Sequence, residues 1–153
     1  HWQWEQVNFA VLSPIVGQHY DKDNNRSCVL RVSGQGFSVL LTGDMETPAE
    51  KILLAANSRQ LASQVLVLGH HGSKTSTSPE FLAAVNPQLA IVSAGYRNQF
   101  GHPSVPVIER LNTKHITIDN TITQGTLVYQ LSPTATIQKE VWRERGHYWL
   151  NSP

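Results

Sequence analysis

The sequence predicts an α/β (α+β) fold in which a mixed β-sheet carries about three helices. Two observations support it: short apolar strands alternate with helical segments through the middle of the chain, and hairpin patterns stand at each end. The chain has 153 residues, 40% of them hydrophobic, which suffices for the core of one domain. We therefore expect residues 1–153 to form a single structural unit.

The first third of the chain is expected to form three strands. A turn at Ser13-Pro14 ends the first strand, and the polar residues 17–26 follow it as a loop. The glycines of residues 34–36 turn the chain between the next two strands, which makes them a hairpin. These strands are expected over residues 7–12, 27–32 and 37–42.

Three helices are predicted from their start signals. Thr47 is expected to cap the first helix, with Pro48 in its first turn and Glu50 completing a capping box. Ser78 and Ser104 are expected to begin the other two helices. The first two helices are expected over 48–57 and 78–85, further strands over 65–68, 89–93, 115–118, 127–131 and 136–141, and an irregular tail over 142–153.

Composition narrows the possible functions. The net charge is +1, from 12 basic and 11 acidic residues, and a protein that binds nucleic acid mainly by neutralising phosphates would be more basic. Cys28 is the one cysteine, so no intrachain disulfide forms, and its strand-like flanks favour a small buried residue over a reactive thiol. No segment approaches the roughly 20 apolar residues of a membrane helix, and the chain begins at His1, so we expect an excised piece of a longer protein.

Polar side chains gather where the predicted strands end. Asp44 follows the hairpin, His70 and His71 follow the next strand, and His102 lies just beyond the strand after that. Parallel strands would bring these side chains to one rim of the sheet, where α/β proteins bind their ligands. A carboxylate beside imidazoles suits zinc or manganese. Taken singly, each residue is more often a helix cap, a turn or an ordinary loop residue, so the functional interpretation depends on the four together.

Several motifs in this order resemble the ComEC branch of the metallo-β-lactamase superfamily. The resemblance runs from about residue 9 to about residue 130. It implies that the chain is the C-terminal half of an αββα sandwich. The matching strings are Leu41-Thr42-Gly43-Asp44, Val67-Leu68-Gly69-His70-His71-Gly72-Ser73-Lys74-Thr75-Ser76 and Gly101-His102-Pro103, with Ser78-Pro79-Glu80-Phe81-Leu82 and Val107-Ile108-Glu109-Arg110-Leu111 as further matches.

The resemblance also implies an activity and residue roles. The family expectation is a metal-dependent phosphodiesterase, a DNA nuclease within the natural-competence (DNA-uptake) channel of the bacterial inner membrane. Asp44 would be the metal-bridging carboxylate and His71 a ligand of the second metal, zinc or manganese. The catalytic residues His70 and His102 would face the scissile phosphate. Implied partners are DNA, single-stranded or duplex, and the membrane channel domain of the same protein, with the soluble domain on the periplasmic side.

One part of the family pattern is missing from this sequence. The main motif, His-x-(His/Asp)-x-Asp-His, should precede the matched region, and the string over residues 19–24 imitates it but ends in Asn24 where histidine is required. Two ligands fall short of the three or more of a stable catalytic zinc site. We therefore expect the isolated chain to hold metal weakly or not at all and to be inactive. Without the missing N-terminal half of the domain, an apolar sheet face would be exposed and would favour self-association.

Two alternatives stay open at this stage. The chain could be a non-catalytic nucleic-acid-binding or docking module with the same fold, or part of a phosphoesterase for another substrate. Arg97, Lys74 and Lys114 are expected near the rim, and Tyr96 or Phe100 could stack on a base. Solvated cations and core aromatic residues explain these five side chains equally well.

Overall fold

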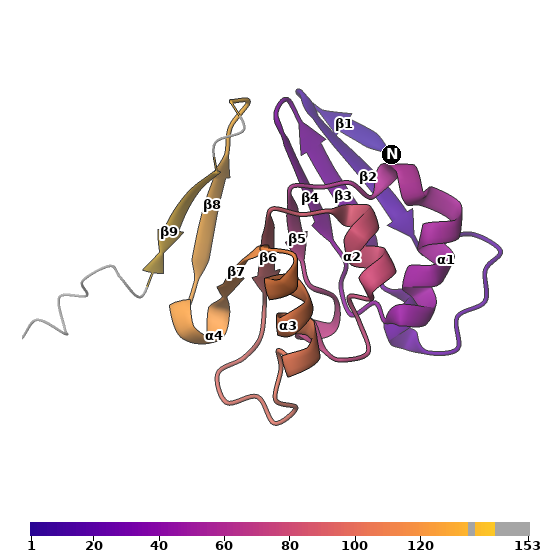
Figure 1. Cartoon of the computed structure of the whole chain (residues 1–153). Helices are drawn as coiled ribbons and strands as arrows, with labels where there is room; N and C mark the ends of the chain where they lie inside the picture. The colour runs from indigo at the N-terminus through magenta and orange to yellow at the C-terminus, as the bar shows by residue number, and fades with distance from the viewer. Residues whose placement is uncertain (135–136, 143–153) are drawn as a thin grey trace, which may run out of the picture.

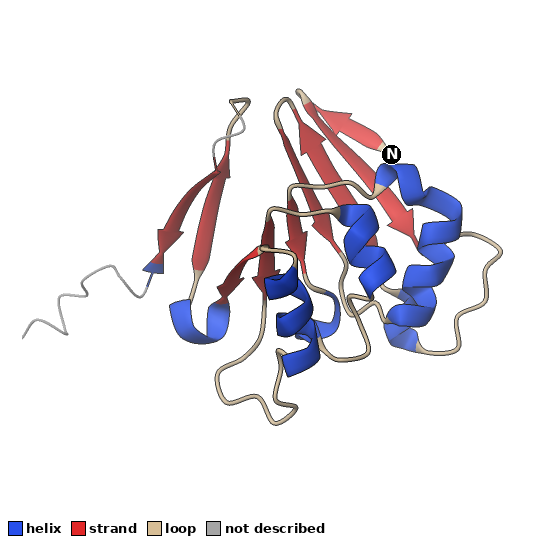
Figure 2. Cartoon of the chain, in the orientation of Figure 1, coloured by secondary structure: helices blue, strands red, loops and turns tan. Residues whose placement is uncertain are grey.

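The computed structural model describes residues 1–134 and 137–142, and it confirms the α/β fold with a mixed sheet. Its strands are β1 (Trp2–Trp4), β2 (Val7–Ser13), β3 (Val29–Gly34), β4 (Phe37–Leu41), β5 (Val65–Val67), β6 (Leu89–Val92), β7 (Thr117–Asn120), β8 (Leu127–Leu131) and β9 (Ile137–Val141). The first seven form one sheet in sequence order, while β8 and β9 form a separate pair (Figure 2). Strands β1 to β4 are antiparallel neighbours, and β4 to β7 run parallel.

Three helices lie on one face of the larger sheet (Figure 1): α1 (Thr47–Asn57), α2 (Pro79–Val85) and α3 (Val105–Thr113). Each of them joins two neighbouring parallel strands, as a crossover connection must. The core lies between these helices and the sheet. Its fully buried members include Leu40, Leu53, Leu66, Leu82, Val85, Ala90, Val92, Val107 and Leu111.

The starts of α2 and α3 confirm the signals in the sequence. The Ser78 hydroxyl accepts the backbone N–H of Phe81 at 3.3 Å and so caps α2. Ser104 is the N-cap residue of α3, and the apolar side chains of Val107 and Leu111 in this helix are fully buried. Both helices therefore begin where a serine precedes the helix and a proline occupies its first turn.

The capping box predicted for α1 is wrong. Glu46 rather than Thr47 is the N-cap residue, and no side chain caps the helix. The buried carboxylate of Glu50 instead accepts the backbone N–H groups of Thr77 and of Ser78 (2.9 Å) in front of α2. Buried N–H groups need partners, so Glu50 satisfies a distant turn and ties α1 to it.

Some short elements and boundaries differ from the prediction. The strand β1 was missed because three residues carry almost no pattern, and it is held on β2 by the Trp2 ring, which stacks on Phe9 at 4.9 Å between centroids. The short helix α4 (Thr121–Gln124) was also missed. Strand β7 begins two residues later than expected, because His115 adopts a left-handed φ of 54°.

Cys28 is exposed, so the prediction of a small buried residue is wrong. The neighbouring Val29 points into the core, and alternation along the strand turns Cys28 away from it. The predicted loop over residues 17–26 contains a short 3-10 turn, Asp23–Arg26. Residues 143–153 of the predicted tail lie outside the described residues. Within the described part, no helix has the length and apolar character needed to cross a membrane.

The sheet face opposite the helices is only partly covered. Leu40 and Leu66 point toward the helices and are fully buried, so Val39 and Val67 point to the opposite face. Four large side chains of that opposite face remain exposed: Trp2, Trp4, Val11 and Leu41. A second sheet would cover such a face. The half-sandwich and the self-association of the chain stay predictions.

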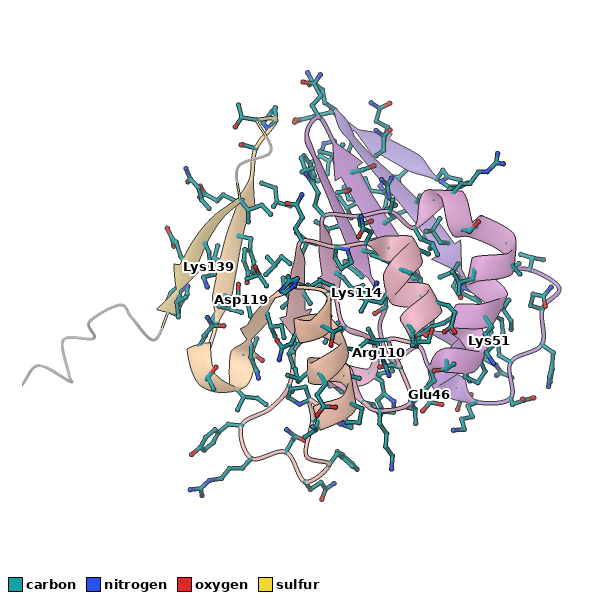
Figure 3. All side chains as sticks on the ribbon, viewed as in Figure 1. Glu46, Lys51, Arg110, Lys114, Asp119 and Lys139 are labelled. Atoms are coloured by element: carbon teal, nitrogen blue, oxygen red, sulfur yellow. The ribbon has the colours of Figure 1, made fainter. Side chains whose placement is uncertain are left out.

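The β8–β9 hairpin is fastened to the same face by Asp119 of β7 (Figure 3). The Asp119 carboxylate is 6% exposed and accepts hydrogen bonds from Tyr129 Oη (2.6 Å), Lys139 Nζ (2.8 Å) and Gln124 Nε2 (3.0 Å). Burial raises the pKa of Asp119, but the hydrogen bonds from Lys139, Tyr129 and Gln124 outweigh it and hold the pKa below its ordinary value. The buried carboxylate is therefore ionised and binds the hairpin to the sheet.

We expect Asp119→Asn to lower the free energy of unfolding by about 1–3 kcal/mol at pH 7, because three hydrogen bonds to a buried charge are weakened. The folded-state pKa of Asp119 lies below the unfolded value of about 3.9, so this contribution is present above about pH 4 and is lost as pH falls through the folded-state pKa. Urea unfolding at pH 7 and pH 3 measures both effects. Asp21→Asn, at a side chain that is 87% exposed, is the control. Equal stability of the Asp119→Asn chain and the unsubstituted chain at pH 7 would contradict the account.

Candidate active site

The loops that follow β4, β5 and β6 meet at the carboxyl ends of these parallel strands. They bring Asp44, His70, His71 and His102 together, as the sequence predicted. His71 Nε2 lies 3.5 Å from Asp44 Oδ1, and the His70 ring centroid lies 6.3 Å from that of His71 and 5.7 Å from that of His102. The four side chains therefore form one cluster at the rim of the sheet.

The turn from Gly69 to Gly72 carries His70 and His71 and sets the orientation of their side chains. Both His70 (φ 48°) and His71 (φ 57°) adopt the left-handed conformation, which costs a non-glycine residue roughly 1–3 kcal/mol. The flanking glycines are required by space. A Cβ on Gly69 would stand 2.7 Å from the Met45 carbonyl oxygen, and one on Gly72 would stand 2.9 Å from a Pro103 side-chain carbon. The turn is thus closely packed between the loop that contains Met45 and the loop that contains Pro103.

Hydrogen bonds tie the same turn to both neighbouring loops. The backbone N–H of His70 donates to the Gly43 carbonyl at 3.0 Å. On the other side, the backbone N–H and the hydroxyl of Ser104 donate to the Gly72 carbonyl at 2.9 and 3.1 Å. The relative positions of the three loops are therefore fixed by backbone contacts.

His71 and Asp44 face each other with the geometry of two metal ligands. His71 Nδ1 lies 2.6 Å from the Ser93 carbonyl, which can only accept, so Nδ1 donates to it and Nε2 is the nitrogen that faces Asp44. Such a bond to a carbonyl typically orients a metal-binding histidine. Two ligands about 2.1 Å from a tetrahedral zinc lie about 3.4 Å apart, close to the 3.5 Å seen here. The residues fit a divalent cation.

His70 has a different partner, the buried carboxylate of Glu46. Glu46 Oε1 lies 3.3 Å from His70 Nδ1 and accepts the Thr75 hydroxyl at 2.9 Å, while Lys22 Nζ donates to Oε2 at 3.0 Å. Burial raises the pKa of Glu46, but the hydrogen bonds from Lys22 and Thr75 and the charges of Lys22 and His70 outweigh it and lower the pKa. An ionised Glu46 therefore holds Nδ1 of His70 and leaves its Nε2 available.

Glu46 was not predicted as part of the site. Its sequence neighbours favour a helix start, and the side chains that surround it come from positions 22, 70 and 75, far apart along the chain. The one local signal was a second carboxylate two residues after Asp44 in the same loop. That spacing alone does not separate a capping residue from a partner of histidine.

His102 presents a buried nitrogen without a partner. Its Nδ1 makes no hydrogen bond in the described part of the chain. Burial lowers the pKa of His102, and the neighbouring His70 and His71 lower it further. Unpaired buried polar atoms are uncommon and are expected where a ligand or water supplies the partner. A cavity of about 320 Å³ adjoins this ring, lined by His71, Ser93, Ala94, Gly95, Asn98, Phe100 and His102.

Other candidates lie apart from this cluster. His19 and Asp21, from the string that imitates the missing motif, pair with each other at 3.3 Å and are 86% and 87% exposed. Lys114 was expected near the rim, but it is the C-cap residue of α3 and lies at the opposite end of that helix from Ser104 (Figure 3). Among the residues that the structure describes, no group of three or more His, Cys, Asp or Glu side chains could hold a metal ion.

The chain is similar in sequence to one segment of several longer bacterial proteins. No family model matches it. It is 41% identical over 152 residues to Competence protein ComA of Neisseria gonorrhoeae, 42% over 127 residues to Recombination protein 2 of Haemophilus influenzae and 38% over 128 residues to ComE operon protein 3 of Bacillus subtilis. These alignments cover 99%, 81% and 84% of this chain but only 22%, 15% and 16% of the relatives. The chain is therefore homologous to one segment, about a fifth or less in length, of bacterial competence proteins.

Proposed function

We propose that the chain carries one side of a metal-dependent phosphodiesterase centre that cleaves DNA in a DNA-uptake protein. The observation that carries the proposal is the facing pair of Asp44 and His71, with the His71 ring fixed by the Ser93 carbonyl. The name of a relative, Competence protein ComA, supports the setting in DNA uptake. In that setting the chain would be part of an inner-membrane protein, exposed on the periplasmic side.

Asp44 and His71 would hold zinc or manganese. A pair of metal ions supplies an acidified water and neutralises the charge of a phosphodiester. The bond from His71 Nδ1 to the Ser93 carbonyl occupies that nitrogen, so Nε2 is the ring nitrogen that would bind the metal. Both side chains are about half exposed, at 51% for His71 and 48% for Asp44, so a substrate can approach them.

His70 and His102 would act on the phosphodiester itself. Glu46 orients His70 through Nδ1, so Nε2 of His70 would donate a proton to the leaving oxygen or bind a phosphate oxygen. His102 closes the other side of the cluster, 5.7 Å from His70 between ring centroids, where it would face the scissile phosphate. Glu46 is a positioning residue in this scheme.

The remaining metal ligands would come from outside this chain. Asp44 and His71 provide two, and a stable catalytic zinc site has three or more. We propose that they lie in the polypeptide that precedes the homologous segment in the complete protein. The described residues contain no three-ligand group, and this observation favours the alternative, a nucleic-acid-binding or docking module without catalysis. The two functions differ in whether the complete protein binds metal at Asp44 and His71.

Calorimetric titration of Zn²⁺ and Mn²⁺ separates these functions. We expect no tight stoichiometric site in the isolated chain and a tight site in the complete protein. Asp44→Asn and His71→Ala should each weaken that site by more than about 100-fold, because groups that only orient a ligand already contribute 10–100-fold. His19→Ala, at an exposed histidine, should have no effect. Tight binding that survives His71→Ala would overturn the proposal.

Cleavage of DNA by the complete protein tests the role of His70. We expect His70→Ala to lower the rate about 10²–10⁴-fold, the range for loss of an acid–base group, with metal affinity unchanged. Glu46→Gln should cause a smaller loss of about 10–100-fold, because glutamine keeps an acceptor but loses the charge. His115→Ala is the matched control, since His115 is exposed and lies outside the site. A His70→Ala protein that cleaves DNA at the normal rate would remove His70 from the mechanism.

A further inference from the structure

We propose that the loop of residues 95–101 is a stacking platform for the bases of single-stranded nucleic acid, formed by Tyr96 and Phe100 with Arg97 beside them. The inference rests on the proposed function, since it names the form of DNA that this site would take. It concerns binding alone, so it can be tested without metal and without cleavage.

The two aromatic rings of this loop are exposed. Tyr96 is 66% exposed and Phe100 is 71% exposed. Exposed aromatic rings on a loop that adjoins a polar site are typical of a binding surface rather than of a core. Trp2 and Trp4 are also exposed, but they lie on β1, at one edge of the sheet. The loop of residues 95–101 precedes α3, which lies near the opposite edge (Figure 1).

The loop that carries the rings is held in shape by Asn98. Its side-chain amide donates to the carbonyls of Gly95 (3.2 Å) and His102 (2.8 Å), and its oxygen accepts the backbone N–H of His102 at 2.8 Å. The backbone N–H of Gly101 donates to the Asn98 carbonyl at 3.3 Å. Because these bonds fix the backbone, less conformational entropy is lost when a base binds to the rings.

The platform leads directly into the candidate active site. The Phe100 ring lies over the His102 ring with 5.8 Å between centroids and 20° between planes. Both rings line the cavity of about 320 Å³ that His71 also borders. A base stacked on Phe100 would therefore place its own phosphate beside His102 and His71. The Arg97 guanidinium carbon lies over one face of the Tyr96 ring, 5.3 Å from its centroid, so the other face would take the base and the guanidinium would meet a backbone phosphate.

Charge favours a single strand over a duplex. With 12 basic and 11 acidic residues, the chain has little positive charge to hold phosphates by electrostatics. Stacking on aromatic rings supplies affinity without that charge, but it requires bases whose faces are free. A single strand offers such faces, and a paired duplex does not.

Fluorescence anisotropy of the chain in EDTA tests the platform with three labelled probes: a dT oligonucleotide, an abasic oligonucleotide of equal length, and a duplex. We expect the dT strand to bind most tightly. Phe100→Ala and Tyr96→Ala should each weaken dT binding by about 5- to 150-fold, the range for loss of one stacked base, and leave abasic binding unchanged. Phe100→Trp should restore dT binding, which separates stacking from a folding defect. Arg97→Ala should weaken dT and abasic binding equally.

Trp4→Ala is the matched control, because Trp4 is an equally exposed ring (70%) on β1. The inference is overturned if the abasic and dT strands bind equally, if the duplex binds more tightly, or if none of the probes binds. It is also overturned if phosphatidylcholine vesicles bind through Tyr96 and Phe100 while oligonucleotides do not, because the loop would then contact a membrane. If the stacking platform is disproved, the proposal of metal binding at Asp44 and His71 still stands. If metal binding is disproved instead, binding of the dT strand in EDTA is still expected.

Discussion

The left-handed turn from Gly69 to Gly72 is the constraint on which the arrangement of the site depends. The turn fits only because both of its ends are glycine, packed against Met45 on one side and Pro103 on the other. Its hydrogen bonds to Gly43 and Ser104 hold the preceding and following loops in register with it. The backbone strain at the two histidines is therefore offset by contacts with both neighbouring loops.

This turn gives two adjacent histidines different surroundings. His71 donates to a backbone carbonyl through Nδ1, and its other nitrogen faces a half-exposed carboxylate. His70 meets the buried, ionised Glu46, which favours a protonated Nδ1 and leaves Nε2 free of this contact. One imidazole suits metal binding and the other suits proton transfer or phosphate binding. Consecutive residues can divide these tasks because the turn directs their side chains to different partners.

Sequence patterns predicted the fold better than they predicted the partners within the site. The strands and helices were found where apolar runs ended in glycine, proline or a capping serine, as at Ser78. The interpretation of Glu50 as part of a capping box failed because its carboxylate accepts two buried backbone N–H groups instead. These groups belong to a turn that lies 27 and 28 residues further along the chain. Glu46 was missed for a related reason, since its partners meet only after folding. The order of the strands sufficed to predict which four side chains lie together, but the hydrogen-bond partners of each side chain became known only from the structure.

The central claim is that Asp44 and His71 are two ligands of one metal ion whose other ligands lie outside this chain. Anomalous X-ray scattering from crystals of the complete protein loaded with Zn²⁺ tests it most directly. The account predicts an anomalous peak within about 2.2 Å of both an Asp44 carboxylate oxygen and His71 Nε2, with further ligands from polypeptide outside these 153 residues. A bound zinc that contacts neither Asp44 nor His71 would contradict it.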